Sequence, residues 1–142
     1  MIKKILLVEE NQAISFLIET ILEKKYTTRK VADSFFAMKE LLSNKLFDLI
    51  LISIDSSESD NFQLLKHMHS SSLLNNIPVI VLSNSTSTGL EITCRQLKIA
   101  DYIRKPFDPL VLLKKATDIT NKNTTEQQEK TRQKITLFNF SF

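Results

Sequence analysis

Three short, uninterrupted aliphatic runs constrain the fold of this 142-residue chain more than any other feature. They occupy residues 5–8, 49–52 and 79–82, and each is apolar at every position. A strand with one face in water alternates apolar and polar residues, whereas a parallel strand buried on both faces is apolar throughout. The three runs therefore predict the central strands of a parallel sheet.

Between these runs, apolar residues recur at the spacing of amphipathic helices. Two weaker strands are expected near residues 28–32 and 100–104, so strands and helices alternate five times over residues 1–120. This order predicts an α/β fold, a doubly wound five-stranded parallel sheet with right-handed crossovers and helices on both faces. The residues at helical spacing are Ile14, Leu17, Ile18, Ile21, Leu22, Phe35, Met38, Leu41, Leu42, Phe62, Leu65, Met68, Leu90, Leu97, Leu110, Leu113 and Ile119.

The chain changes character after Thr120, which divides it into a domain of residues 1–120 and a tail of residues 121–142. Residues 121–134 are almost purely polar, typical of a linker or of a solvated helical extension. The last residues are apolar again, so we expect them to dock on the domain, on a second copy in a homodimer, or on a partner. These apolar residues are Leu137, Phe138, Phe140 and Phe142.

Composition excludes several classes of protein. A hydrophobic fraction of 42% and a charged fraction of 25% exclude a disordered chain. No apolar run approaches the length of a membrane span. The net charge of +3 is too small and too dispersed to indicate nucleic-acid binding. A single cysteine, Cys94, excludes a disulfide framework and indicates a cytoplasmic protein.

Polar residues follow the predicted strands at the ends where open parallel sheets bind their ligands. Glu9 and Glu10 end the first strand, Asp55 follows the third, Ser83 ends the fourth and Lys105 follows the fifth. Adjacent carboxylates at such an edge suit Mg²⁺, which prefers oxygen ligands. The alternative is that both are solvated acids that favour the dipole of the next helix.

Four stretches of the chain, in order and in register, resemble the receiver domain of two-component response regulators, similar to the single-domain chemotaxis regulator. The resemblance covers residues 1–120 and implies a flavodoxin-like sheet with strand order 2-1-3-4-5. It also implies a cis peptide bond between Lys105 and Pro106. The four stretches are residues 5–10, 47–52, 77–83 and 101–107.

The resemblance also implies roles for the residues at the strand ends. Glu9 and Glu10 match the acidic pair that holds Mg²⁺. Ser83 matches the hydroxyl that bonds the phosphoryl group, and Lys105 matches the lysine that pairs with it. Tyr102 matches the aromatic residue that changes rotamer on switching, although packing at the sheet edge explains a tyrosine there equally well.

Ser53 occupies the phosphoacceptor position, where the family has an aspartate. A carboxylate attacks phosphohistidine as an anion and binds the metal, whereas a serine hydroxyl is neutral at pH 7 and needs a base. The replacement removes the nucleophile and one negative charge from the metal site. We therefore expect conventional aspartyl phosphorylation to be lost and Mg²⁺ binding to be weakened.

Asp55 lies two residues further on and is the one carboxylate that could compensate for Ser53. It could serve as a weak Mg²⁺ ligand, or act as a substitute phosphoacceptor, but a solvated loop acid is the simpler interpretation. Two further departures indicate a degenerate site, because Asn61 and Lys98 stand where the family's turns use glycine. The chain contains a single glycine, Gly89.

We interpret the chain as an atypical pseudo-receiver of two-component phosphorelay signalling, which is not an enzyme and acts by protein–protein interaction. We expect the face of the fourth helix and fifth strand to contact a histidine kinase or an output protein. This face carries the basic residues Arg95, Lys98, Arg104 and Lys105. The alternative is that these residues form a solvated charged surface with no partner. A second hypothesis is a working phosphoacceptor that uses Asp55 or a modified Ser53. A third, a flavin-binding electron carrier, is disfavoured because the acidic pair after the first strand would repel the FMN phosphate.

Overall fold

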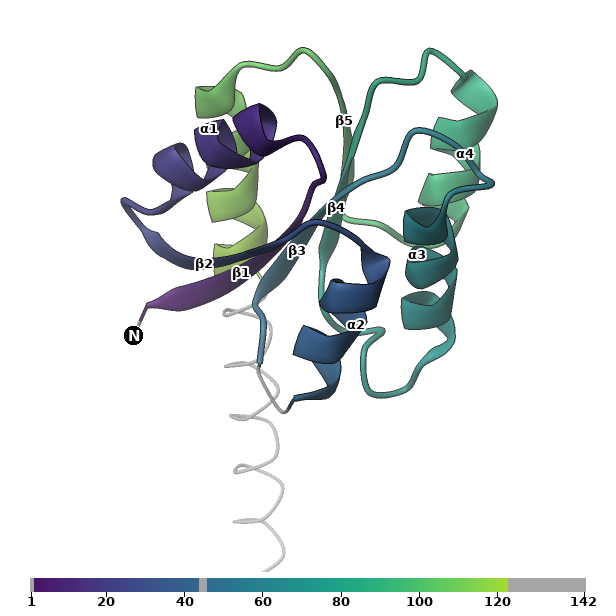
Figure 1. Ribbon diagram of the computed structural model, residues 1–142, viewed down its shortest axis with the longest axis horizontal. Helices are drawn as coiled ribbons and strands as arrows, with labels where there is room; N and C mark the ends of the chain where they lie inside the picture. Colours follow the sequence, from purple (N-terminus) through teal and green to yellow (C-terminus); the bar gives the residue numbers. More distant parts are fainter. Residues whose placement is uncertain (1, 44–45, 123–142) are drawn as a thin grey trace, which may run out of the picture.

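The strands of the chain form one five-stranded parallel sheet, which is shown in Figure 1. The computed structural model describes residues 2–43 and 46–122. The strand order is β2-β1-β3-β4-β5, and every neighbouring pair is parallel, so the predicted order is confirmed. The strands are β1 (Lys3–Val8), β2 (Tyr26–Val31), β3 (Leu49–Ser53), β4 (Val79–Ser83) and β5 (Asp101–Arg104).

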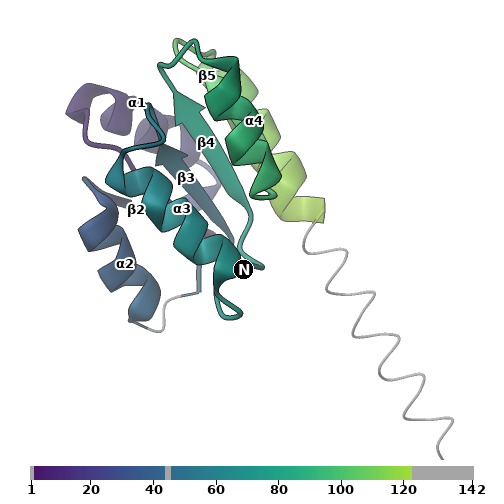
Figure 2. The same ribbon diagram turned by 90° about the vertical axis from the view of Figure 1, so that its right-hand side faces the viewer.

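Helices cover both faces of the sheet, as Figures 1 and 2 show. Helix α1 and the helix of residues 109–122 lie on one face, and α2, α3 and α4 lie on the other. None of the helices within the described ranges is both long enough and apolar enough to cross a membrane. The first four helices are α1 (Gln12–Leu22), α2 (Ser34–Leu42), α3 (Asp60–Ser70) and α4 (Thr88–Gln96).

The last described helix includes residues 121 and 122, the first two positions of the predicted tail. Residues 123–142, with the four apolar side chains expected to dock, lie outside the described residues. The division of the chain at residue 120, the docking of the tail and the homodimer therefore stay predictions.

The central strands bury their side chains on both faces, which is why their sequences are continuously apolar. In β1, Leu6 and Val8 join the core beneath α2, α3 and α4, whereas Ile5 and Leu7 join the core beneath α1 and residues 109–122. All four of these side chains are fully buried. The same alternation in β3 and β4 divides the interior into two cores separated by the sheet.

Each of the first four helices begins with a side-chain cap. The side-chain oxygen of the capping residue accepts a hydrogen bond from the backbone N–H three residues later, which satisfies one of the free donors of the first turn. Since each helix follows a parallel strand, the four caps lie toward the carboxyl edge of the sheet. The capping residues are Asn11, Asp33, Ser59 and Ser87.

Lys98, in the turn before β5, has a φ angle of 60°, in the left-handed region that favours glycine. It is the non-glycine residue with positive φ in the described part of the chain. Asn61, the other residue at a position where the family has glycine, lies in the first turn of α3 and does not have a positive φ. The helical backbone at Asn61 is unstrained, whereas the positive φ of Lys98 strains the backbone, because a residue with a Cβ occupies a conformation that favours glycine.

Lys98→Gly is expected to stabilise the fold by about 0.5–1 kcal/mol, because relief of the left-handed strain exceeds the added entropy of the unfolded chain. Urea unfolding measures the change. Lys98→Ala is the matched control, since it keeps the Cβ and should give no gain. A Lys98→Gly variant no more stable than Lys98→Ala would refute the strain.

Cys94 lies in α4 and is fully buried in the core beneath it. Burial, followed by the nearby negative charge of Glu91, raises the pKa of the Cys94 thiol to about 11. A thiol-directed reagent such as Ellman's reagent should therefore react with the native chain at least about 100-fold more slowly than with the urea-unfolded chain. Rapid labelling under native conditions would contradict the burial.

Candidate functional site

The carboxyl edge of the sheet brings together Glu9, Ser53 and Lys105 in a closed triangle of hydrogen bonds. The Lys105 ammonium donates to Glu9 Oε1 at 2.7 Å and to Ser53 Oγ at 2.9 Å. The Ser53 hydroxyl in turn donates to Glu9 Oε1 at 2.8 Å. Side chains from β1, β3 and the segment after β5 thus meet, as predicted from the strand ends.

The ion pair of Glu9 and Lys105 is buried. The Glu9 side chain is 2% exposed and that of Lys105 is 6% exposed, so neither charge is compensated by bulk water. Asn61 adds a further contact, because its side-chain amide donates to the Ser53 carbonyl at 2.8 Å. The Ser53 hydroxyl is therefore held between Glu9 and Lys105, and Asn61 holds the backbone of the same residue.

The remaining carboxylates do not complete a metal site in this arrangement. Glu10 and Asp55 are both exposed, although they line the same pocket as Glu9 and Ser53. Within residues 2–43 and 46–122, no three acidic, histidine or cysteine side chains are placed to hold one ion. Lys105 already pairs with the buried Glu9 carboxylate, the kind of oxygen ligand that Mg²⁺ prefers.

The Asp55 side chain contacts the loop between β4 and α4. Its Oδ1 accepts a 2.7 Å hydrogen bond from the Asn84 backbone N–H. The Ser83 hydroxyl lies 3.5 Å from the same oxygen, at the outer limit for a hydrogen bond. Ser83, predicted as a switch residue, therefore contacts Asp55, whereas Lys105 contacts Glu9 and Ser53.

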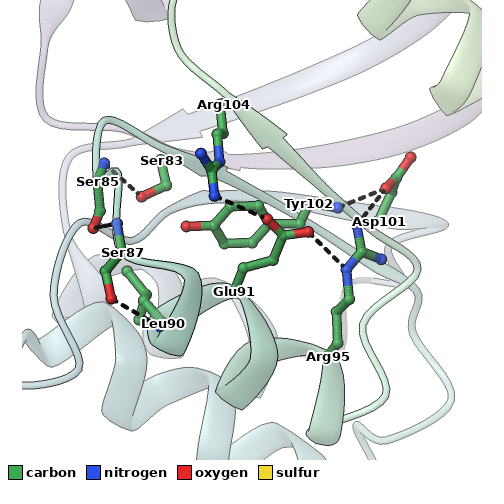
Figure 3. Close-up of polar contacts among 9 residues, drawn as sticks. All are labelled: Ser83, Ser85, Ser87, Leu90, Glu91, Arg95, Asp101, Tyr102 and Arg104. Atoms are coloured by element: carbon green, nitrogen blue, oxygen red, sulfur yellow. Dashed lines mark hydrogen bonds and ion pairs between the residues drawn. The ribbon is translucent and has the colours of Figure 1, made fainter.

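Tyr102 lies in the core beneath α4 and is 6% exposed. Its hydroxyl is buried and has no hydrogen-bond partner among the described residues. Figure 3 shows the ring between the β4–α4 loop and a group of charged side chains on α4 and β5. The burial of Tyr102 is what packing at the sheet edge requires, and its role as a switching aromatic stays a prediction.

The charged side chains of the α4–β5 face are paired with one another. Glu91 accepts from Arg95 at 3.0 Å and from Arg104 at 3.3 Å, as Figure 3 shows. Asp101 pairs with Arg95 and Lys115. The face is therefore less basic than expected, because its arginines share acidic partners and Lys105 is buried in the triangle.

Asp101 is the acid that links β5 to both α4 and the helix of residues 109–122. Burial opposes its ionisation, but hydrogen bonds from Lys115 and from the Tyr102 backbone N–H outweigh that effect and lower the pKa of the carboxyl group. A lowered pKa stabilises the fold above the pKa of the unfolded chain, and this contribution is lost as the pH falls through the folded value.

The architecture and the strand-end site agree with one family of signalling domains. The family model for the response regulator receiver domain matches residues 5–117. The chain belongs to this family. The resemblance that four stretches of the sequence indicated is thereby confirmed, as is the cis peptide bond between Lys105 and Pro106.

Solved receiver domains share the fold. The chain superposes on a receiver domain protein from Methanospirillum hungatei with a TM-score of 0.79 at 24% identity, covering 89% of this chain and 99% of that one. The phosphorylated cyanobacterial phytochrome response regulator RcpA gives a TM-score of 0.71 at 29% identity, with 84% and 91% of the two chains covered. These two comparisons support the assignment of the five-stranded sheet of this chain to the receiver fold.

Curated relatives include longer proteins. The transcriptional regulatory protein GltR of Pseudomonas aeruginosa is 27% identical over 111 residues, which cover 78% of this chain and 46% of GltR. The two-component response regulator-like protein APRR9 of Arabidopsis thaliana is 33% identical over 107 residues, 73% of this chain and 23% of APRR9. The chain thus spans less than half the length of these relatives.

Proposed function

We propose that this chain is a pseudo-receiver, a receiver domain that signals by binding another protein and no longer accepts a phosphoryl group by the usual aspartyl route. The observation that carries the proposal is the closed triangle of Glu9, Ser53 and Lys105. The only carboxylate that the Ser53 hydroxyl contacts among the described residues, Glu9, is already paired with the Lys105 ammonium and is therefore a poor base for activating the hydroxyl. In this interpretation the domain is not an enzyme, and it acts in the cytoplasm, as the single cysteine indicated.

Mg²⁺ would bind weakly in such a domain. The response regulator Rcp1 has been solved in a Mn²⁺-bound form, with a TM-score of 0.69 and 27% identity to this chain. In this chain, an ion at the carboxyl edge of the sheet would have to compete with the Lys105 ammonium for Glu9. Glu10 and Asp55 are exposed, so their carboxylates would be weaker ligands for the ion than a buried carboxylate.

The partner would be a histidine kinase or an output protein that contacts the α4–β5 face. This face carries the paired arginines 95 and 104 and the side chain of Ile92, which is 57% exposed. A membrane or nucleic acid is not part of the proposal, since the arginines are already neutralised by acids of the same face.

A phosphoacceptor that uses Asp55 or a modified Ser53 is the competing function. The hydrogen bond from Asn84 to Asp55 disfavours it, because the carboxylate is held on the β4–α4 loop instead of beside Lys105. Transfer of a phosphoryl group requires the attacking carboxylate oxygen to approach in line with the leaving group, and this approach depends on placement of that oxygen within about an ångström.

Incubation with acetyl phosphate and Mg²⁺, followed by intact-mass measurement, distinguishes the two functions. We expect the chain to keep its unmodified mass. An adduct of about +80 Da, one HPO₃ unit, mapped to Asp55 or Ser53 would establish the competing function and refute the pseudo-receiver.

A further inference from the structure

The loop between β4 and α4 is held by a ladder of serine side chains. Ser83 Oγ accepts a hydrogen bond from the Ser85 N–H at 3.1 Å, and Ser85 Oγ accepts from the Ser87 N–H at 3.1 Å. Ser87 caps α4 by accepting from the Leu90 N–H at 3.2 Å. Figure 3 shows these three contacts in succession along the loop. The ladder therefore connects the end of β4 to the first turn of α4.

Asp55 anchors the first step of this ladder from the neighbouring β3–α3 loop. The 2.7 Å contact from the Asn84 N–H to its carboxylate is a charge-assisted hydrogen bond, shorter than each of the other steps. The Ser83 hydroxyl is directed at the same oxygen while it accepts from Ser85. The Asn84 N–H thus donates to a negatively charged oxygen that also lies 3.5 Å from the Ser83 hydroxyl.

We propose that the Asp55 carboxylate takes the place of a phosphoryl oxygen at Ser83, the residue whose hydroxyl the family resemblance assigns to phosphoryl binding, and that the Asn84 N–H holds the carboxylate there. The internal anion holds the β4–α4 loop and the start of α4 in one arrangement without any bound phosphoryl group. The relevance of this arrangement to signalling rests on the proposed pseudo-receiver function. Asp55 is then a positioning residue, which acts by holding the β4–α4 loop.

The position of α4 matters because the same helix is tied on its other side. Glu91, in its first turn, pairs with Arg104 of β5. Leu90 and Tyr102 pack in the same core beneath the helix. An anchored loop on one side and an ion pair on the other keep Tyr102 buried, so loss of Asp55 should loosen both the loop and the contacts over the tyrosine.

The test is amide hydrogen exchange measured by NMR on the full chain and on Asp55→Ala. We expect the amides of Asn84, Ser85 and Ser87 to exchange at least about tenfold faster in the variant, while amides of β1 and β3 keep their wild-type rates. Glu58→Ala is the matched control, because Glu58 is an exposed acid of the same β3–α3 loop. Unchanged exchange in Asp55→Ala would overturn the proposal.

Chemical rescue separates the binding of an anion by the loop from a merely structural contact. Formate or inorganic phosphate at about 50 mM, a concentration suited to millimolar affinity, should restore protection of the Asn84 amide in Asp55→Ala, whereas neutral formamide at the same concentration should not. Neither anion should change the wild-type chain, in which the Asp55 carboxylate already occupies that place. The proposal would be overturned if Asp55→Ala lost protection and the anions did not restore it. It would also be overturned if the anions changed amide exchange in the wild-type chain as much as in Asp55→Ala. A phosphoryl adduct on the wild-type chain would refute the pseudo-receiver function, but it would not change what the exchange results say about Asp55 and the loop.

Discussion

Lys105→Met is expected to lower the free energy of unfolding by about 3–5 kcal/mol, because it leaves the buried Glu9 carboxylate without its cation. Methionine keeps most of the volume of the lysine stem, so the loss reports the missing charge instead of a cavity. Equilibrium unfolding in urea measures the change.

Two further variants assign that loss to the ion pair. Glu9→Gln/Lys105→Met removes both charges and should recover most of the stability, because no uncompensated charge then remains buried. The surface pair of Arg29 and Glu40 provides the control, and Arg29→Met should cost less than about 1 kcal/mol. If Lys105→Met and Arg29→Met had equal effects, the buried pair would not exist in solution.

Ser53→Asp is expected to accept a phosphoryl group, which the proposed pseudo-receiver function predicts that the wild-type chain does not accept. The side chain at position 53 lies at the carboxyl end of β3, with the Lys105 ammonium 2.9 Å from its oxygen. A carboxylate there supplies the missing nucleophile and draws Lys105 away from Glu9, which also adds a negative charge for Mg²⁺. After incubation with acetyl phosphate and Mg²⁺, intact mass should show an adduct of about +80 Da in the variant.

Ser53→Asn is the control for this gain, because it has the same shape and no nucleophilic carboxylate. It should remain unmodified under the same conditions. If Ser53→Asp also remained unmodified, the absence of a carboxylate at position 53 would not be what disables the site. The arrangement of Glu9, Glu10 and Lys105 would then be responsible.

The sheet could be predicted from the sequence because burial on both faces leaves a direct mark on it. The runs of β1, β3 and β4 are apolar at every position, and the structure buries each of these side chains. The weaker strands were located less well: β2 begins at Tyr26 and β5 at Asp101, against predicted starts at 28 and 100. Edge strands carry polar residues, so their ends leave a fainter pattern.

The positions of Glu9, Ser53 and Lys105 at the ends of strands predicted that they lie at one edge of the sheet. These positions did not predict the contacts among the three side chains. Whether Lys105 bonds Glu9 or a neighbouring acid depends on side-chain rotamers, which spacing in the sequence does not determine. The direction of Asp55 was missed for the same reason. The serine ladder had a readable signal, because serines at 83, 85 and 87 have the spacing of successive side-chain turns.

A titration with Mg²⁺ tests the closed triangle most directly, because the ion must displace the Lys105 ammonium to reach Glu9. The backbone amides of Glu9, Ser53 and Lys105 would be followed by NMR, with Ser53→Asp as the positive control. We predict no saturable shift in the wild-type chain up to about 20 mM Mg²⁺ and a saturable shift in the variant. Saturation of the wild-type amides with a dissociation constant of about 1 mM or below would contradict the closed site.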